Sequence, residues 1–496
     1  MSAVLFIIYL LLAYFLIWRT GSRHVNGVSP LRLLFLFTVK LFYAYFFLFV
    51  YTDYYGGGEL TADAGRFFRE SIILNDVFYQ SPRDFLHFIA GWRENPELIE
   101  HYLSATSHWN AGNQFLPNDS RNVIRVNALL YFISNGSVYI HFLFFSFCSF
   151  IASLDFFQLL RKHSKVKGKW LIVFVAIAPS IAFWSSSIIK EPLMITGLFI
   201  LMRGVFDAIN WKRKTWRILL GALFLIGFKP YVSIVLICAL FFYLIWSRIS
   251  QWQVVNIITF VLFGFVFLYT TGGLQKMTTV ISKQQEDFMN VRDGGLYLDA
   301  GNDQYYYIYF NNRKAFDLHN SKAVLQRPVG AFLMDIDDNF TRNLIHLDAV
   351  GDTFHVAVAM DQAGSGIEVT TIQGSFPTMI KMIPEVLFNT LIRPLPKPSQ
   401  TWLQYPAFIE NCCYLIFLFL ALVPARRSIN KKEVRMTCTM ALFAFFVLLI
   451  VGWTTPVVGA IVRYVIPAQV GLLAIILIMI DPQKLKATIN HITRRS

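Results

Sequence analysis

Leu472–Ile480 reads LLAIILIMI, and Leu415–Val423 reads LIFLFLALV. Each segment is apolar at every position, without the alternation of apolar and polar residues that is typical of strands in a membrane β-barrel. Inside a bilayer such a segment satisfies its backbone hydrogen bonds as a helix. These two segments therefore predict an all-α polytopic membrane protein.

The composition of the 496-residue chain agrees with this prediction. Hydrophobic residues make up 55% of the chain and charged residues 15%, whereas soluble domains carry about 25% charged residues. This balance excludes a soluble enzyme, a disordered chain and a secreted disulfide scaffold. Basic residues in cytoplasmic connections explain the net charge of +14, so no nucleic-acid partner is expected.

Apolar segments separated by charge clusters predict about eleven transmembrane helices. Several are shorter than the roughly 20 residues of a full crossing, and the pair joined at Lys229-Pro230 is either a crossing hairpin or a re-entrant one. The expected spans are 3–18, 31–51, 137–160, 170–184, 192–208, 218–228, 232–247, 254–270, 406–424, 436–453 and 464–480.

Two long segments are too polar to cross a membrane, and they divide the chain into five parts. The expected parts are two N-terminal spans in 1–51, a first outer loop domain in 52–136, a membrane bundle in 137–270, a second outer loop domain in 271–405, and C-terminal spans with a cytoplasmic tail in 406–496.

The distribution of Lys and Arg predicts the orientation. Lys and Arg are concentrated in every second connection between the spans. The short connections on the opposite side of the membrane hold only Lys190, Lys229 and Arg463. Cytoplasmic loops are enriched in Lys and Arg. We therefore expect a multi-pass protein of the plasma (inner) membrane, with its N-terminus outside, its C-terminus in the cytoplasm and both loop domains on the outer face.

A carboxylate near the start of the first loop domain is the candidate catalytic residue. It is Asp63, in the segment 54–68, YYGGGELTADAGRFF. A carboxylate at the mouth of a membrane cavity suits a general base that takes a proton from an incoming hydroxyl. A helix cap explains Asp63 as well, and Asp53 and Glu59 are competing candidates for the base.

More charged residues are predicted at the outer ends of the spans, where each is costly unless it is paired or hydrated. Lysine binds phosphate through its positive charge, and arginine binds it through two parallel hydrogen bonds. Together these residues predict an outward-facing site that binds an anion. The alternative for Lys190 is snorkelling to the headgroups beside a counter-charge. The substrate-binding candidates are Lys190, Glu191, Lys229, Tyr231, Arg393, Glu410 (placed to pair with Arg393 or Lys190) and Arg463.

The sequence contains no firm metal or cofactor motif. Asp335, Asp337 and Asp338 loosely fit a divalent-cation cluster, but they lack the glycine and terminal Glu of a calcium loop, and a solvated turn explains them too. Lys40 is the one charge predicted well inside a span, where it faces the bundle interior or snorkels. A proton or ion relay needs more such groups, which argues against a secondary transporter.

At these residues the chain resembles the GT-C superfamily of integral membrane glycosyltransferases, of the bacterial envelope-polysaccharide type. The resembling features are the TADAG segment around Asp63, the Ser-rich turn that ends in Lys190-Glu191, the segment 384–410, and RYVIP from Arg463. The resemblance implies that Asp63 is the general base. It also implies that Lys190, Lys229, Arg393 and Arg463 contact a lipid phosphate. In the family the acidic loop usually follows the first span, whereas here it follows the second.

The function implied by this resemblance is an inverting sugar transfer at the outer face. The expected partners are a polyprenyl-phosphate-linked sugar donor, a glycan or lipid acceptor, and membrane lipid. The alternatives are an envelope polysaccharide polymerase or ligase, a flippase or transporter of lipid-linked glycans, and a structural subunit of an envelope complex. A transporter needs polar residues along the whole depth of the bundle, whereas the enzyme needs them at the outer end.

Overall fold

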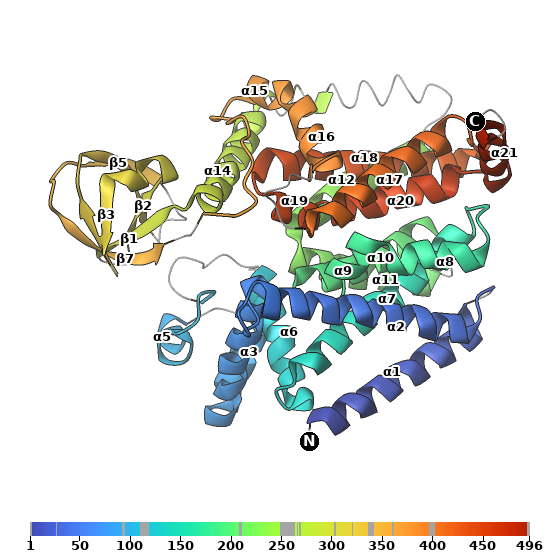
Figure 1. Ribbon diagram of the computed structural model, residues 1–496, viewed down its shortest axis with the longest axis horizontal. Helices are drawn as coiled ribbons and strands as arrows, with labels where there is room; N and C mark the ends of the chain where they lie inside the picture. The colour runs from blue at the N-terminus through green and yellow to red at the C-terminus, as the bar shows by residue number, and fades with distance from the viewer. Residues whose placement is uncertain are drawn as a thin grey trace.

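The computed structural model describes residues 2–25, 27–91, 95–109, 119–207, 211–248, 263–264, 266, 269–301, 304–319, 321–335, 342–359, 362–395 and 402–493. Within these ranges the protein is a helical bundle with a β-sheet that projects from one end (Figure 1).

Five of the described helices are long and apolar enough to cross a membrane, and a bent pair makes a sixth. The five are α1 (Ser2–His24), α2 (Pro30–Phe49) with its π-helical continuation η1 (Val50–Tyr54), α7 (Val138–Arg161), α17 (Gln404–Leu422) and α18 (Lys431–Thr454). In the bent pair, α19 (Val458–Tyr464) meets α20 (Ile466–Met479) at 50°. The predicted number of eleven is thus not reached among the described residues.

Several of the other predicted spans are shorter helices. The span 170–184 divides into α8 (Gly168–Ile177) and α9 (Pro179–Trp184), because a proline has no N–H for the preceding turn and favours a helix start. Most of 254–270 lies outside the described residues. The next helices along the chain are α10 (Lys190–Phe206), α11 (Trp211–Phe228) and α12 (Pro230–Arg248).

Glycines bring α10 and α11 into close contact. A Cβ atom added at Gly197 would lie 2.6 Å from Cβ of Phe224 and 2.9 Å from the carbonyl oxygen of Gly221. No carbon atom fits at such distances, so glycine lets the two backbones approach, as small residues do between membrane helices. This packing fixes α10, whose first turn contributes to the site described below.

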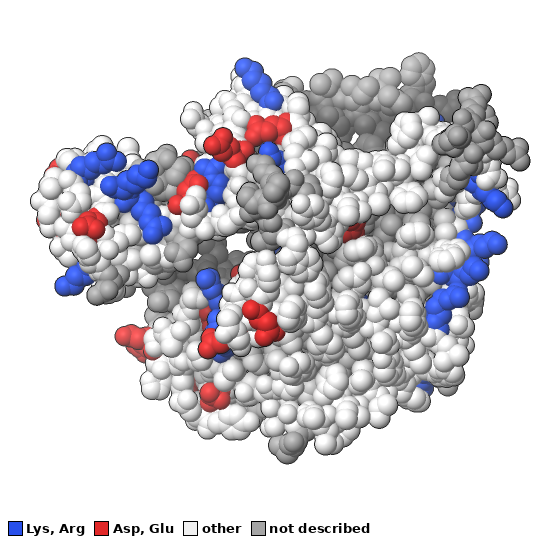
Figure 2. Space-filling view, viewed as in Figure 1, with Lys and Arg blue, Asp and Glu red and all other residues white. Residues whose placement is uncertain are grey.

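The outside of the bundle is apolar. Large side chains such as Leu11 and Phe15 of α1, Phe35 and Phe42 of α2 and Phe419 of α17 are exposed. Figure 2 shows a middle band almost without charged residues, and basic residues gathered at the end where α8 and α21 (Pro482–Thr493) lie. An apolar belt of this kind matches the hydrocarbon interior of a bilayer, and it supports a membrane location.

The two polar segments predicted as loop domains fold differently from each other. The first contains α3 (Ala62–Gln80), α4 (Pro82–Ala90), α5 (Pro96–Leu103) and α6 (Asp119–Ser134). The second contains α14 (Gly273–Asp293), a β-sheet, α15 (Phe376–Lys381) and α16 (Ile383–Leu391). Both lie at the same end of the bundle in Figure 1, opposite α8 and α21.

The sheet corrects the all-α prediction. It has seven strands in the order β3-β4-β7-β1-β2-β5-β6, and the pairs are antiparallel. Tyr306 and Ile308 pack with Leu296 and Leu298 on one face, so the aromatic segment 304–308 follows the period of two of a half-buried strand. The strands are β1 (Leu296–Gly301), β2 (Gln304–Ile308), β3 (Phe316–His319), β4 (Lys322–Leu325), β5 (Val329–Asp335), β6 (Arg342–Leu347) and β7 (Thr353–Ala359), with the 3₁₀ turn η2 (Phe310–Ala315) after β2.

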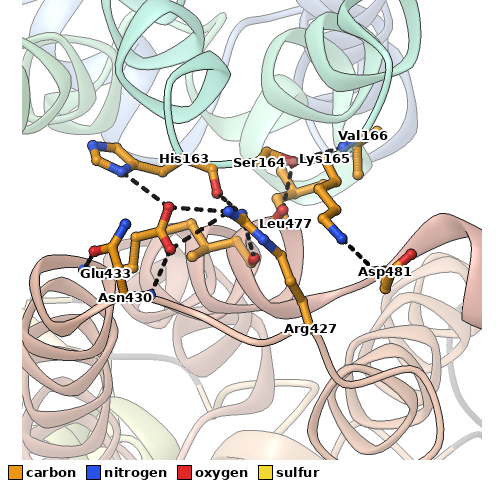
Figure 3. A network of polar contacts seen from close by, with 10 residues as sticks. His163, Ser164, Lys165, Val166, Arg427, Asn430, Glu433, Leu477 and Asp481 are labelled. Atoms are coloured by element: carbon orange, nitrogen blue, oxygen red, sulfur yellow. Dashed lines mark hydrogen bonds and ion pairs between the residues drawn. The ribbon is translucent and has the colours of Figure 1, made fainter.

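A polar network ties the helices together at the end predicted to be cytoplasmic (Figure 3). Arg427 donates to the backbone carbonyl of His163 and contacts Glu433 at 3.2 Å, and His163 Nδ1 lies 3.5 Å from the same carboxylate. Asn430 and Glu433 also form a capping box at the start of α18. The network therefore joins the α7–α8 connection to the α17–α18 connection.

Candidate functional site

Four helices begin close together at the end of the bundle that carries the polar segments, and they bring their first residues together. They are α3, α6, α10 and α12, and each contributes a charged side chain at or next to its N-terminus. The N-terminus of a helix carries a partial positive charge and favours anions. Arg463, near the end of α19, completes the group.

Arg463 connects two carboxylates. Its Nη1 donates to Asp63 Oδ2 at 2.6 Å, and its Nε lies 2.8 Å from Glu191 Oε1. The same oxygen of Glu191 lies 3.0 Å from Lys229 Nζ. Four of the residues predicted from the sequence therefore form one continuous ion-pair network. The N-cap residue of α3 is Thr61, and Asp63 lies in the first turn.

A second pair extends this network. Lys190 Nζ donates to Asp119 Oδ1 at 2.7 Å. Sequence reasoning missed Asp119, although Asn118-Asp119-Ser120 ahead of an apolar segment is a typical helix start. Lys190 thus has a direct carboxylate partner at the end of the bundle that carries the polar segments.

The side chains of the network differ in exposure. Asp63 is 44% exposed and Asp119 29%, Lys190 and Arg463 are 16% and 12%, and Glu191 is fully buried. Lys229, with 6% exposure, is nearly as buried as its partner Glu191. Three cations balance three carboxylates, so an incoming anion has to compete with Asp63 and Asp119 for their partners.

Aromatic rings lie next to two of the cations. Lys229 Nζ lies 4.2 Å from the ring centroid of Tyr464 and 5.6 Å from that of Tyr231. The guanidinium carbon of Arg463 lies 5.9 Å from the ring centroid of Trp184. Cations over aromatic faces are stabilised where water is excluded. The structure thus places Tyr231 in the site, as predicted, and adds Tyr464 and Trp184.

Asp63 is ionised at neutral pH. Burial alone raises its pKa, but the charge and hydrogen bond of Arg463 outweigh it, with smaller contributions from Lys190 and Arg66, and lower the pKa to about 2. While it is paired with Arg463, Asp63 is therefore a weak base. Displacement of Arg463 removes the main cause of the lowered pKa and makes the carboxylate more basic.

The turn that presents Lys190 and Glu191 is held by buried serines. Ser149 Oγ of α7 donates to the carbonyl oxygen of Ser185 at 2.6 Å, and Ser146 Oγ donates to that of Ser186 at 3.2 Å. Lys40 Nζ donates to Ser185 Oγ at 2.6 Å. These bonds satisfy polar groups where the helical chain is broken between α9 and α10. Lys40 faces the bundle interior, one of the two orientations expected from the sequence.

Glu70 anchors the helix that carries Asp63. It accepts hydrogen bonds from Ser107 N at 3.0 Å and Ser107 Oγ at 2.6 Å, and its carboxylate lies 2.9 Å from His108 Nδ1. Burial alone raises the pKa of Glu70, but the hydrogen bonds from His108 and Ser107 outweigh it and lower the pKa. The orientation of α3, and with it the position of Asp63, is fixed by this contact with the segment after α5.

Arg393 and Glu410 do not join the network, which corrects the prediction that Glu410 pairs with Arg393 or Lys190. Glu410 Oε2 instead accepts hydrogen bonds from Ser180 N, at 2.8 Å, and from Ser180 Oγ. The guanidinium carbon of Arg393 lies 5.7 Å from the ring centroid of Phe388. The two residues belong to the side of the bundle formed by α9, α16 and α17.

The possible metal cluster cannot be described as a whole, because Asp337 and Asp338 lie outside the described residues and only the backbone of Asp335 is placed, at the end of β5. Among the described residues, no group of three or more His, Cys, Asp or Glu side chains is arranged to hold a metal ion.

No family model, curated protein or solved structure matches the chain. The fold and the network define a helical membrane protein with a charge-balanced polar site at the end of the bundle that carries its large polar segments.

Proposed function

We propose that the protein is a membrane glycosyltransferase. In this proposal it moves a sugar from a polyprenyl-phosphate donor to a hydroxyl group of a glycan or lipid acceptor on the outer face of the membrane. The observation that carries the proposal is the network in which Arg463 joins Asp63 to Glu191 and Lys229. A carboxylate that suits a base and cations that suit a phosphate lie in direct contact there.

The cations would receive the phosphate of the donor. Arg463 offers a planar group for bidentate hydrogen bonds, and Lys190 and Lys229 add compact positive charges. The N-termini of α3, α6, α10 and α12 add to the positive potential. Negative charge that develops on the departing phosphate would be stabilised by these fixed groups.

The reaction would use Asp63 as the base. The acceptor oxygen attacks the anomeric carbon, its proton goes to Asp63, and the bond between that carbon and the phosphate oxygen breaks with its electron pair on the phosphate. Binding of the phosphate to Arg463 would loosen the pair with Asp63 and raise the basicity of the carboxylate when the donor is in place. A single displacement of this kind inverts the anomeric carbon.

The proposal is tested with the Asp63→Asn variant in lipid nanodiscs. The assay follows radiolabelled sugar from a panel of synthetic polyprenyl-phosphate sugars into acceptor, and we expect D63N to lose at least a hundredfold in turnover while it still binds donor. Asp76→Asn is the matched control, because Asp76 is exposed on the same helix, α3, and has no role in the proposal. Near-normal turnover by D63N refutes the role of Asp63.

The polymerase or ligase alternative uses a lipid pyrophosphate. Three cations in one cluster suit two phosphate groups as well as one. The same assay separates the two reactions, because a polymerase transfers from pyrophosphate-linked oligosaccharides and leaves the monophosphate donors unused. A transporter is less well supported, since this network lies at one end of the bundle.

A further inference from the structure

A cavity of about 220 Å³ lies next to the charged network. It is formed between α2 with η1, α9, α17 and α19. Trp184, one of its lining residues, has its ring centroid 5.9 Å from the guanidinium carbon of Arg463. Its volume is smaller than the roughly 300 Å³ at which sites for drug-sized ligands begin. The cavity therefore suits a headgroup or a single sugar rather than a whole lipid.

The wall of the cavity is rich in aromatic rings. They come from three different helices or connections and include Tyr43, Phe46, Tyr51, Phe183, Trp184 and Trp402. The faces of such rings carry negative electrostatic potential and attract organic cations. Among the described residues that line the cavity there is no lysine or arginine.

Two buried oxygen atoms of the lining have no hydrogen-bond donor among the described residues. They are Glu410 Oε1 and Gln404 Oε1, on side chains that are 8% and 9% exposed. The other carboxylate oxygen of Glu410 is held by Ser180. A buried polar group without a partner is costly, and a buried carboxylate needs a counter-charge. Both orphan atoms are acceptors, so the missing ligand group is a donor.

We propose that this cavity binds a primary ammonium group. Its N–H donors would go to Glu410 Oε1 and Gln404 Oε1, and its charge would lie among the aromatic rings. A quaternary ammonium fits the rings but has no N–H to donate, so the two oxygens select the primary form. The ammonium group has two possible sources: an ethanolamine headgroup of the bilayer, or an amino sugar of a glycan.

The first test compares headgroups on the wild-type protein by calorimetric titration. The lipid probes are dihexanoyl phosphatidylethanolamine and dihexanoyl phosphatidylcholine, and the sugar probes are glucosamine and N-acetylglucosamine. We expect the primary-amine member of one pair to bind at least tenfold more tightly than its partner. The pair that shows this preference identifies the source of the ammonium group. Equal affinity within both pairs overturns the proposal.

The second test uses Glu410→Gln, which removes the charge and keeps the shape of the side chain, with Glu59→Gln as a matched control at an exposed glutamate. The preferred amine should lose at least tenfold in affinity in E410Q and keep its affinity in E59Q. Unchanged binding in E410Q contradicts the proposal. If E410Q does not fold, Gln404→Leu takes its place and should also weaken binding of the preferred amine. The comparison of headgroups on the wild type then still tests the proposal.

This site does not depend on the proposed transferase reaction. Asp63 is absent from the cavity lining, so D63N should bind the amine as the wild type does. If D63N loses sugar transfer but the wild type shows no preference for the amine, the ammonium site is rejected and the proposed role of Asp63 stands. An amine preference with normal transfer in D63N would reject Asp63 as the base alone.

Discussion

Asp63 and Arg463 are 400 residues apart in the chain, and their side chains are joined by a hydrogen bond of 2.6 Å. This contact connects the first turn of α3 with the bent pair near the C-terminus. Because Arg463 also contacts the fully buried Glu191, one guanidinium holds the N-terminal, central and C-terminal parts of the bundle around the same site.

Replacement of Arg463 should destabilise the protein. Arg463→Gln leaves Glu191 with Lys229 as its remaining ion-pair partner, and breaking a buried pair typically costs about 3–5 kcal/mol. Chemical unfolding in detergent micelles measures this loss. Arg66→Gln is the control, since Arg66 is exposed one turn along α3 and should change the free energy of unfolding by less than about 1 kcal/mol. Equal stability of R463Q and R66Q would show that the network contributes little.

The pH dependence of stability should report the pair between Asp63 and Arg463. The folded-state pKa of Asp63 is lowered to about 2 from its ordinary value of 3.8, so its contribution is fully present above about pH 4 and is lost as the pH falls towards 2. Asp63→Asn should therefore be less stable than the wild type at pH 7, and the difference should shrink below pH 4. Thermal unfolding at stepped pH measures the difference, and a constant gap down to pH 2 would exclude this pair as its source.

Ser149, which holds the turn before Lys190, should contribute more to the stability of the protein than Ser153, one helical turn further along α7. Ser149→Ala removes the donor to the Ser185 carbonyl and leaves a buried acceptor unpaired, at a cost of about 1–3 kcal/mol. Ser153→Ala is the control, because Ser153 Oγ donates to Phe150 O within its own helix. Thermal unfolding of the two variants compares them. If S153A is as destabilised as S149A, the cost comes from α7 itself and not from the turn.

The polar network around Arg427 and Glu433 should stabilise α18. Glu433→Ala removes the capping box and the partner of Arg427, and we expect a loss of about 1–3 kcal/mol. Lys431→Ala, at an exposed position of the same helical turn, should have little effect. Chemical unfolding of both variants measures the difference, and similar stabilities would mean that the connections are held by other contacts.

The local parts of the fold could be predicted from the sequence. The long apolar helices, such as α2 and α18, follow from side-chain chemistry, which acts within one segment of chain. The break at Pro179 was not predicted, since 170–184 was expected as one span, although the missing proline N–H explains it. The sheet was missed because its strands are short and their pairing is irregular, as at the register shift between Asp299 and Gly301. Strand pairing depends on distant segments, and so it is absent from a local pattern.

The same distinction applies to the site. Asp63, Glu191, Lys229 and Arg463 could be selected because each is a charge at the predicted end of an apolar span. Which charge pairs with which depends on how the helices pack, and the expectation for Glu410 was wrong for that reason. Ser180, which accompanies Glu410 instead, carries no charge that would have drawn attention to it.

The proposed reaction requires that this network binds the phosphate of a lipid carrier. The direct measurement is native mass spectrometry of the protein with a polyprenyl phosphate and with the polyprenol of the same length. We predict that the wild type retains the phosphate at least tenfold better than the alcohol, and that Arg463→Gln abolishes the preference whereas Arg66→Gln keeps it. Equal retention of phosphate and alcohol by the wild type would contradict the account.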